Sequence, residues 1–505
     1  MMSQPHVRSV FASLVLGATL ALIGPVQAQD RALTLALATN VNTLDPHNTA
    51  SVGNDLSVIS HLHAALLVRG PDMKLKPQLA TGWTAVDNTT WRFTLRAGVT
   101  FSNGEALDAE AVKWNIERVM DPKMNSRIRP WFAAVKEIKV NSPTEIDLIT
   151  KDPYPALPDQ LSMFYLLPPK WTPGNTPASA AVGAGPYELK QFVTGDRVVL
   201  TARPGWFGEK PAFDTVTFRV IPEAGARIAA LMAGEVDFIS AVPPSEMKRI
   251  GQSGKAKADA VDSVRSVFVK YNVLTAPMKD NVKLRQALNY AVDRPAIRDA
   301  IWNGMGSIST CQVLTPAYFG YNPDLKPHSY DVAKAKALLK EAGIAPGALT
   351  IEFEVPVGPY LLAQDIVQAV ASQLDEVGVK TKIVEMEFGS WMNKYLRAAN
   401  MGQMAYLAQA WPTLDADGLL SLYEGGNPYA YWDDQTFSGL IRQARATTDK
   451  AARQALYKQA TERMCDQAPV LFLFSQPYTY ASANRVTWTP RGDDWVRAED
   501  FRLAR

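Results

Sequence analysis

The stretch LTIEFEVPVGPYLLAQDIVQAVASQLDEVGVKTKIVEM, from Leu349 to Met386, combines a strand, a helix and a second strand. LTIEFEV and VKTKIVEM are typical of strands, and the segment from Leu361 to Val377 predicts a helix that ends before Gly378. A helix of this length between two strands implies a right-handed crossover that places the strands parallel in one sheet. The stretch therefore predicts an α/β fold.

The same alternation continues on both sides of this stretch. Before it, VFVKYNVL after Ser266 predicts a strand, and LRQALNYAV and DVAKAKALLKEAG predict helices, the second ending at Gly343. After it, KAARQALYKQATERM predicts the last helix and APVLFLFSQPYTYAS a buried strand. The second half of the chain is therefore expected to form a domain of its own around a largely parallel sheet.

The first half is richer in strands. LTLALA, from Leu33 to Ala38, predicts an opening strand, and apolar residues at helical spacing from Leu56 to Leu67 predict a helix. WRFTLR alternates apolar and polar residues as a half-buried strand does, and Asp108 stands at the N-cap position of the helix AEAVKWNIERVM. A hairpin around residues 141–143 follows, then three strands, a helix ended by Gly234 and the strand VDFIS.

Length and charge restrict the class of protein. A chain of 505 residues exceeds what one hydrophobic core usually supports, so two domains are expected. The formal net charge is +2, and the 52 basic and 50 acidic residues are scattered along the chain. Nucleic acid and anionic membranes are therefore not expected as partners.

The N-terminus has the features of a secretory signal. Arg8 precedes the apolar run VFASLVLGATLALIG, and the small residues around Ala28 predict cleavage there, so residues 1–28 are expected to be a signal peptide. In an oxidising compartment the two cysteines, Cys311 and Cys465, either form a disulfide or are two buried apolar residues.

A secreted hydrolase is the main alternative for such a chain, and it would need a recognisable catalytic motif. The sequence contains no G-x-S-x-G, no H-E-x-x-H and no Walker loop. His61 and His63 fall in a predicted helix, where residues two apart face different ways, so no metal site is expected. Asp415 and Asp417 lie too close in one loop to be a glycosidase pair. We therefore expect neither an enzyme nor a cofactor.

Six fragments, taken in order, are specific: WRFTLRAGVTFSNGEALDAEAVKWNIER, GAGPYELKQF, ARPGWFGEKPAFDTVTFRVI, RIAALMAGEVDFI, VKLRQALNYAVDRPAI and YDVAKAKALLKEAG. Together they resemble family 5 bacterial extracellular solute-binding proteins, the peptide, opine and nickel group that supplies ABC importers. The resemblance runs from about Leu33 to the C-terminus. It implies a two-lobed periplasmic-binding-protein-like α/β fold (type II, cluster C) with an extra subdomain in the first lobe.

The resemblance also implies where the lobes begin and end. The first lobe would comprise residues 29–270, including a subdomain at about 71–170, together with the C-terminal return of residues 475–505. The second lobe would comprise residues 271–474. The chain would cross between the lobes near Val267 to Val273 and near Leu473 to Pro477.

The resemblance carries the family's ligand-binding positions onto both lobes. In the second lobe they fall in QAWPTLDAD, where an acid would hold a ligand ammonium and an indole would add apolar contact. The alternative is that Asp417 caps the next helix and Asp415 is solvated. The expected ligand-binding residues are Asn48, Thr49, Asn54, Trp131, Met163, Phe164, Gln409, Trp411, Asp415 and Asp417.

Arginines that the family uses for ligand carboxylates are missing at the matching positions. Met163 and Phe164 stand where nickel-chelate binders carry one, and the helix LLAQDIVQAV has none. The resemblance thus implies a ligand that is cationic or neutral where it faces Asp415. The expected function is a monomeric periplasmic receptor that passes a peptide-like or opine-like solute to an inner-membrane permease with ATPase subunits. An oligosaccharide or metal-chelate binder of the same fold is the alternative.

Overall fold

The computed structural model describes residues 31–49, 53–357, 360–396 and 400–504. The predicted signal peptide lies outside these ranges. Ala32–Arg505 form one compact unit. None of the helices in the described ranges is both long and apolar enough to cross a bilayer.

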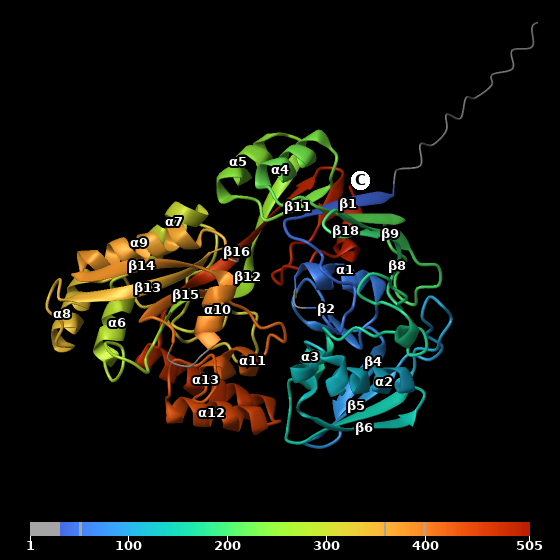
Figure 1. The fold of residues 1–505 in the computed structure, drawn as a ribbon, viewed down its shortest axis with the longest axis horizontal. Helices are drawn as coiled ribbons and strands as arrows, with labels where there is room; N and C mark the ends of the chain where they lie inside the picture. Colours follow the sequence, from blue (N-terminus) through green and yellow to red (C-terminus); the bar gives the residue numbers. More distant parts are fainter. Residues whose placement is uncertain (1–30, 50–52, 358–359, 397–399, 505) are drawn as a thin grey trace, which may run out of the picture. The chain divides into compact units, whose positions relative to one another are not determined.

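A ten-stranded sheet runs through this unit (Figure 1). In spatial order its strands are β14 (Val379–Glu387), β13 (Leu349–Val357), β15 (Met404–Gln409), β12 (Ala256–Tyr271), β16 (Val470–Ala483), β11 (Phe238–Ser240), β1 (Ala32–Leu37), β10 (Thr215–Val220), β9 (Arg197–Ala202) and β8 (Tyr187–Val193). The long strands β12 and β16 connect two groups of elements, which are the two lobes of the fold.

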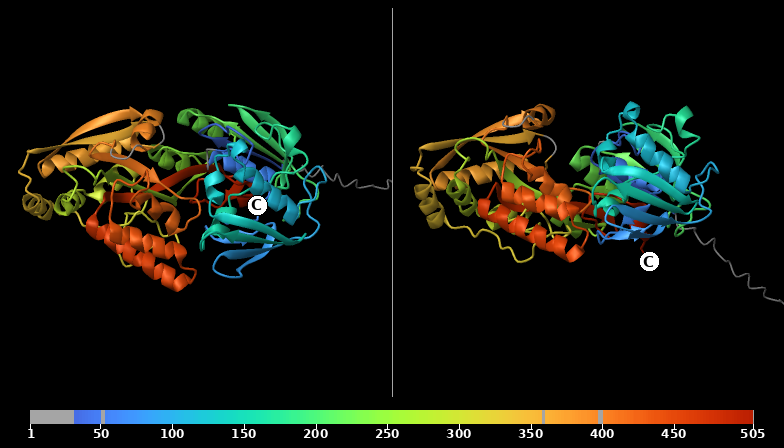
Figure 2. Two further views of the ribbon diagram at one scale, coloured as in Figure 1. Left: turned by 60° about the horizontal axis from the view of Figure 1, so that its bottom comes forward. Right: turned by 90° about the horizontal axis from the view of Figure 1, so that it is seen from below.

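The second lobe is a sheet between two helical layers. One face is covered by α6 (Val282–Tyr290), α7 (Arg294–Trp302), α8 (Val332–Glu341) and α9 (Ala363–Glu376). The other is covered by α10 (Phe388–Leu396), α11 (Ala416–Leu420), α12 (Gln435–Ala446) and α13 (Lys450–Gln467). Figure 2 shows α12 and α13 as an adjacent pair. Alternate residues of β12 point to opposite faces of the sheet. Val267 and Val269 pack against the helices α6 to α9, and Phe268 packs against α10 to α13.

The first lobe combines the other half of the sheet with α1 (Asn54–Leu62), α4 (Ala224–Ala233) and α5 (Pro244–Gln252). A separate four-stranded sheet contains β4 (Ala80–Ala85), β5 (Thr90–Leu95), β7 (Glu145–Thr150) and β6 (Val135–Ser142), and it packs with α2 (Ala109–Met120) and α3 (Leu157–Leu161). Two short pairs complete the fold: β2 (Leu67–Arg69) with β3 (Leu75–Pro77), and β17 (Val486–Trp488) with β18 (Phe501–Leu503).

Several sequence predictions are confirmed. The Asp108 side chain accepts a hydrogen bond from the Ala111 amide and so caps α2. Gly234 ends α4 with φ of 77°, and Gly378 follows α9 with φ of 86°. These left-handed conformations favour glycine because it has no Cβ.

Two predictions were wrong. The helix expected to reach Leu67 ends at Leu62, and Leu67 begins β2. The sheet of the second lobe is mixed: β13 pairs parallel with β14 and β15, as the opening stretch predicts, but β12 pairs antiparallel with β15 and β16. The apolar runs show burial on both faces, and they carry no information about strand direction.

Candidate functional site

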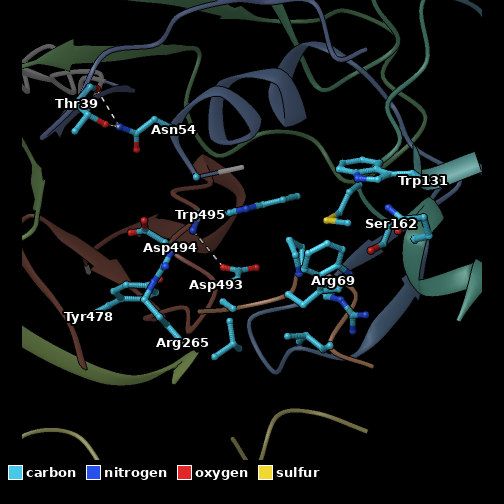
Figure 3. A pocket seen from close by; sticks show the side chains of 18 of the residues that line it. Thr39, Asn54, Arg69, Trp131, Ser162, Arg265, Tyr478, Asp493, Asp494 and Trp495 are labelled. Atoms are coloured by element: carbon cyan, nitrogen blue, oxygen red, sulfur yellow. Dashed lines mark hydrogen bonds between the residues drawn. The ribbon is translucent and has the colours of Figure 1, made fainter. Parts of the chain in front are cut away.

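A cavity of about 710 Å³ lies among loops and strand ends of both lobes (Figure 3). Its walls contain three indoles, those of Trp131, Trp411 and Trp495. The other lining residues are Thr39, Gly53, Asn54, Arg69, Gln160, Ser162, Met163, Val264, Arg265, Tyr360, Phe388, Ala410, Pro412, Leu414, Tyr478, Asp493 and Asp494. Mostly apolar walls with a few polar groups are typical of small-molecule sites.

A break in the pairing of β12 with β16 places Arg265 in this cavity. Residues 256–262 of β12 pair with 477–483 of β16, and pairing resumes in a shifted register at Ser266 with Ser475. Bulges of this kind redirect side chains. Arg265 lies within the break and lines the cavity.

The C-terminal tail loop, residues 491–495, docks on the same break. The Val264 amide donates to the Gly492 carbonyl at 2.9 Å. A Cβ on Gly492 would lie 2.9 Å from the Asp262 carbonyl oxygen, so glycine allows this close approach. The docking brings Asp493, Asp494 and Trp495 to the cavity.

The acids of the tail loop differ in their partners. The Arg491 Nε and Nη2 donate to the two oxygens of Asp493 at 2.9 and 2.6 Å. Among the described residues Asp494 makes no hydrogen bond or ion pair, and burial raises its pKa to about 6, although Arg265 opposes the shift. Asp494 has φ of 66°, a conformation that Asp adopts more readily than most residues.

Among the described residues, the Arg265 side chain donates hydrogen bonds to neutral groups. Its Nε donates to the Tyr478 hydroxyl and its Nη1 to the Ala408 carbonyl, both at 3.2 Å. The other lining arginine, Arg69, is paired with Asp159 at 2.6 Å. Within the described part of the chain, Arg265 and Asp494 are the charged lining residues that lack an ion-pair partner.

The expectation that Asp415 presents a free carboxylate to the ligand is wrong. Its side chain is 3% exposed, and the Arg453 Nη1 and Nη2 donate to its two oxygens at 2.5 and 2.7 Å. Asp415 also caps α11, since its Oδ1 accepts from the Asp417 amide at 2.9 Å. Asp417 is not the cap: it accepts from Arg445 at 2.9 Å. Both predicted anchors are thus neutralised outside the cavity lining.

Trp411, by contrast, does line the cavity. Its amide donates to the Tyr318 hydroxyl at 2.6 Å, and its indole lies against Gly418 of α11. A Cβ on Gly418 would be 1.9 Å from the indole Cδ1, so only glycine leaves room for this orientation.

The remaining predicted residues separate into two groups. Asn54, Trp131 and Met163 line the cavity. Asn48 lines a different cavity, Thr49 is buried and donates to Asp55, Phe164 stacks on His47 in the interior of the first lobe, and Gln409 lies outside the lining. Phe164 and Gln409 are each next to a lining residue in the sequence, Met163 and Ala410, but they are not part of the lining themselves.

Sequence reasoning missed Arg265, Asp494, Trp495 and Gln160. Gln160 is 3% exposed, and its Nε2 has no hydrogen-bond partner among the described residues. An acidic pair before a tryptophan, RGDDW, was the one available signal for the tail. Nothing in SVRSVFVKY marked Arg265, because the bulge arises from pairing with a distant strand.

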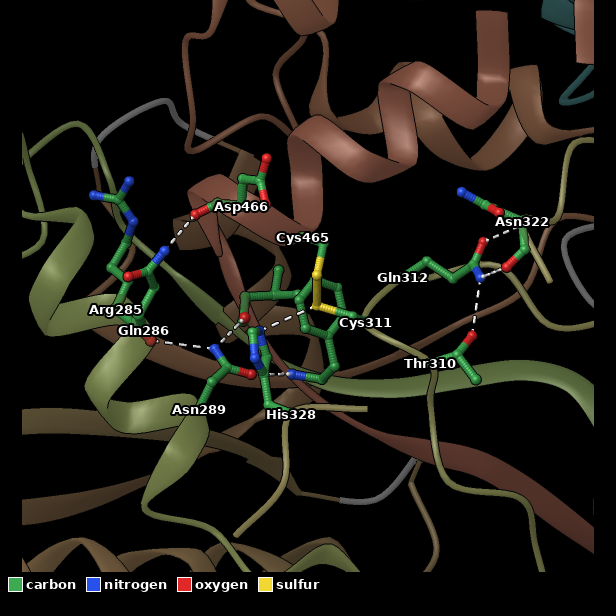
Figure 4. Close-up of a disulfide and its surroundings, with 12 residues drawn as sticks. Arg285, Gln286, Asn289, Thr310, Cys311, Gln312, Asn322, His328, Cys465 and Asp466 are labelled. Atoms are coloured by element: carbon green, nitrogen blue, oxygen red, sulfur yellow. Dashed lines mark hydrogen bonds between the residues drawn. A yellow bond between two sulfur atoms is a disulfide. The ribbon is translucent and has the colours of Figure 1, made fainter. Parts of the chain in front are cut away.

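Of the two alternatives for Cys311 and Cys465, the structure has the disulfide, with the two Cα atoms 5.2 Å apart (Figure 4). The His328 Nε2 lies 3.1 Å from the Cys311 sulfur. These three residues have ligand types suited to a metal, but the two sulfurs are bonded to each other and are not thiolates.

Comparison with known proteins agrees with this architecture. The family model "Bacterial extracellular solute-binding proteins, family 5 Middle" matches residues 74–437. The dipeptide-binding protein of Escherichia coli (strain K12) is 31% identical over 434 residues, covering 79% of this chain and 80% of the relative. The glutathione-binding protein GsiB of the same organism is 28% identical over 496 residues, covering 94% of both chains.

A solved structure shows the same fold. NikA from Brucella suis, in complex with Fe(III)-EDTA, superposes with a TM-score of 0.85 at 25% identity, covering 94% of this chain and 100% of NikA. The matched family model, the relatives and the two-lobed α/β architecture agree. The chain belongs to family 5 of the bacterial extracellular solute-binding proteins.

Proposed function

We propose that this protein is the periplasmic solute-binding receptor of an ABC importer. It would capture a peptide-like or opine-like organic solute in the cavity and present it, as a monomer, to an inner-membrane permease driven by ATPase subunits. No catalytic step is part of this proposal. Family membership supports the receptor role, and relatives named for dipeptide and glutathione binding support a solute of this chemical kind.

The observation that carries the proposal is the cavity itself. Its volume of about 710 Å³ lies within the range of roughly 300–1,000 Å³ found for small-molecule sites. It is walled by Trp131 and Trp495 of the first lobe and Trp411 of the second. A solute that contacts both walls favours the state in which both are close to it, which is how such receptors couple binding to closure.

Mass spectrometry of the solute that co-purifies with the protein tests this proposal, followed by thermal-shift screening of peptides, opines, oligosaccharides and metal chelates. A solute at 100 times its dissociation constant should add about 2.7 kcal/mol to the free energy of unfolding. Trp411→Ala should weaken binding, and Trp206→Ala, outside the cavity lining, should not. Absence of binding throughout the screen would contradict the receptor role, and turnover of any compound would indicate an enzyme.

A further inference from the structure

We propose that the solute carries an ammonium and a carboxylate on neighbouring atoms, as an α-amino acid head group does, with the carboxylate on Arg265 and the ammonium on Asp494. The body of the solute is uncharged and extends toward Trp131. This inference rests on the proposed receptor function and specifies the chemical class of its solute.

The Arg265 guanidinium has N–H donors left with which to bind an anion. It carries five N–H donors, and the structure uses one on Nε and one on Nη1, both toward uncharged oxygens. Its Nη2 has no partner among the described residues. A guanidinium in a partly enclosed site binds a carboxylate more strongly than a neutral acceptor, because both partners of that bond are charged.

Asp494 is suited to bind a cation. Its carboxylate lines the cavity without a donor from any described residue, and enclosure of the charge disfavours ionisation. A carboxylate in this condition is stabilised by a cation that brings its own N–H donors. An ammonium group of the solute meets this requirement.

Arg265 and Asp494 interact electrostatically, but no nitrogen–oxygen distance between them is within the 4.0 Å of an ion pair in the described structure. Figure 3 shows both side chains next to Tyr478 on one side of the cavity. A head group with opposite charges on neighbouring atoms can lie between them and contact both. The two termini of an extended tripeptide lie roughly 10 Å apart, which does not suit two adjacent sites.

The other side of the cavity has a different chemistry. Trp131 and Ser162 lie there, away from Arg265 and Asp494 (Figure 3), and Met163 contributes to the same lining. The Nε2 of Gln160, which has no partner in the described part of the chain, is a donor for a carbonyl or hydroxyl oxygen of the solute. The remaining charged residues of the lining already form ion pairs: Arg69 with Asp159, and Asp493 with Arg491. A neutral, partly aromatic body with a hydrogen-bond acceptor fits this side.

The test uses the full processed protein and three probes: γ-L-glutamyl-L-tyrosine methyl ester, Nε-benzoyl-L-lysine and S-benzyl-L-cysteine. Each is supplied with a free head group, with the amine acetylated, and with the head carboxylate as a primary amide. Isothermal calorimetry should show binding of at least one free-head probe, and each blocked form of that probe should bind at least about tenfold more weakly, as expected for loss of a charged hydrogen bond.

Variants assign the two charges. Arg265→Gln should weaken the free-head probe at least about tenfold but leave the affinity for its amide unchanged, and Asp494→Asn should do the same with respect to the acetylated form. Arg265→Lys retains the charge and should retain part of the carboxylate preference. Arg219→Gln and Asp196→Asn change surface residues outside the cavity and should bind as the original protein does. Thermal unfolding of each variant verifies that it folds.

Four outcomes overturn the inference. If blocked and free forms bind equally, or if both pocket variants keep full affinity for the free form, the head group is not recognised at these residues. If no free-head probe binds but another solute class does, the inference fails and the receptor function stands. If nothing binds in either this set or the broader screen, both fail.

Discussion

Arg453 and Asp415 form a bidentate ion pair, and both side chains are buried. Asp415 lies in the loop that was expected to bind the ligand. Removing one partner of such a pair leaves the other charge buried without compensation. Asp415→Asn should therefore lower the free energy of unfolding by about 3–5 kcal/mol. Urea denaturation measures the loss.

Asp417→Asn is the matched comparison for that prediction. Its partner Arg445 is more exposed and also donates to Glu424 at 2.9 Å, so it keeps an anion after the change. A loss of about 1 kcal/mol or less is expected. Equal losses for the two variants, or a specific loss of solute affinity in Asp415→Asn, would contradict the structural role of Asp415.

Gly418→Ala should disturb Trp411. The added methyl group would overlap the indole ring, so the ring has to leave its position in the cavity wall, and solute affinity should fall about tenfold or more. Tryptophan fluorescence and calorimetry follow the two effects. Gly439→Ala is the control, because a Cβ there in α12 would meet no atom within 4 Å apart from its chain neighbours and its own helix backbone, and that variant should be as stable as the original or slightly more so.

The disulfide closes a long segment, since 154 positions separate Cys311 from Cys465. Replacing both cysteines by alanine should cost about 2–5 kcal/mol, because the unfolded chain regains freedom. Urea unfolding with and without dithiothreitol measures the effect: the reductant should destabilise the original protein and leave the double variant unchanged. A double variant as stable as the oxidised protein would contradict this prediction.

Lys270 should make stability depend on pH. Its Nζ is buried in the second lobe, 3.0 Å from both the Tyr395 hydroxyl and the Tyr429 carbonyl, and burial lowers its pKa to about 7. The unfolded chain keeps this amine protonated up to about pH 10, so between pH 7 and 10 the unfolded state binds more protons. The Lys270 contribution to the free energy of unfolding therefore rises with pH across this window.

Lys270→Met removes the titration. Relative to the original protein, the variant should be most stable at pH 6 and should lose that advantage by about pH 10, as measured by urea unfolding at several pH values. Lys283→Met, which changes a half-exposed partner of Glu341, is the control and should show a constant difference. A constant difference for Lys270→Met as well would contradict the lowered pKa.

The sequence predicted features that depend on neighbouring residues. Asp108 and Gly234 act on the helix next to them, and the strand–helix–strand order from Leu349 onward follows from local periodicity. The family resemblance found the loop of Trp411, which lines the cavity.

The sequence could not predict which charges are free. Asp415 is neutralised by an arginine 38 positions away on α13, and that pairing is decided by helix packing. Arg265 and Asp494 line the same cavity because the tail loop docks on a register break, and neither segment carries a motif for that docking. The expected wall of acids without an arginine is therefore replaced by a site in which one charge of each sign has no ion-pair partner among the described residues.

The register break has a mechanical consequence. Strands β12 and β16 join the lobes, and between Asp262 and Ser266 their ladder is already interrupted. Bending the strands within this segment would break few interstrand hydrogen bonds, whereas bending them where the ladder is continuous would break more. Arg265 lies within this interrupted segment and lines the cavity, so under the proposed mode of binding the solute would contact the sheet at the point where the two strands are least firmly paired.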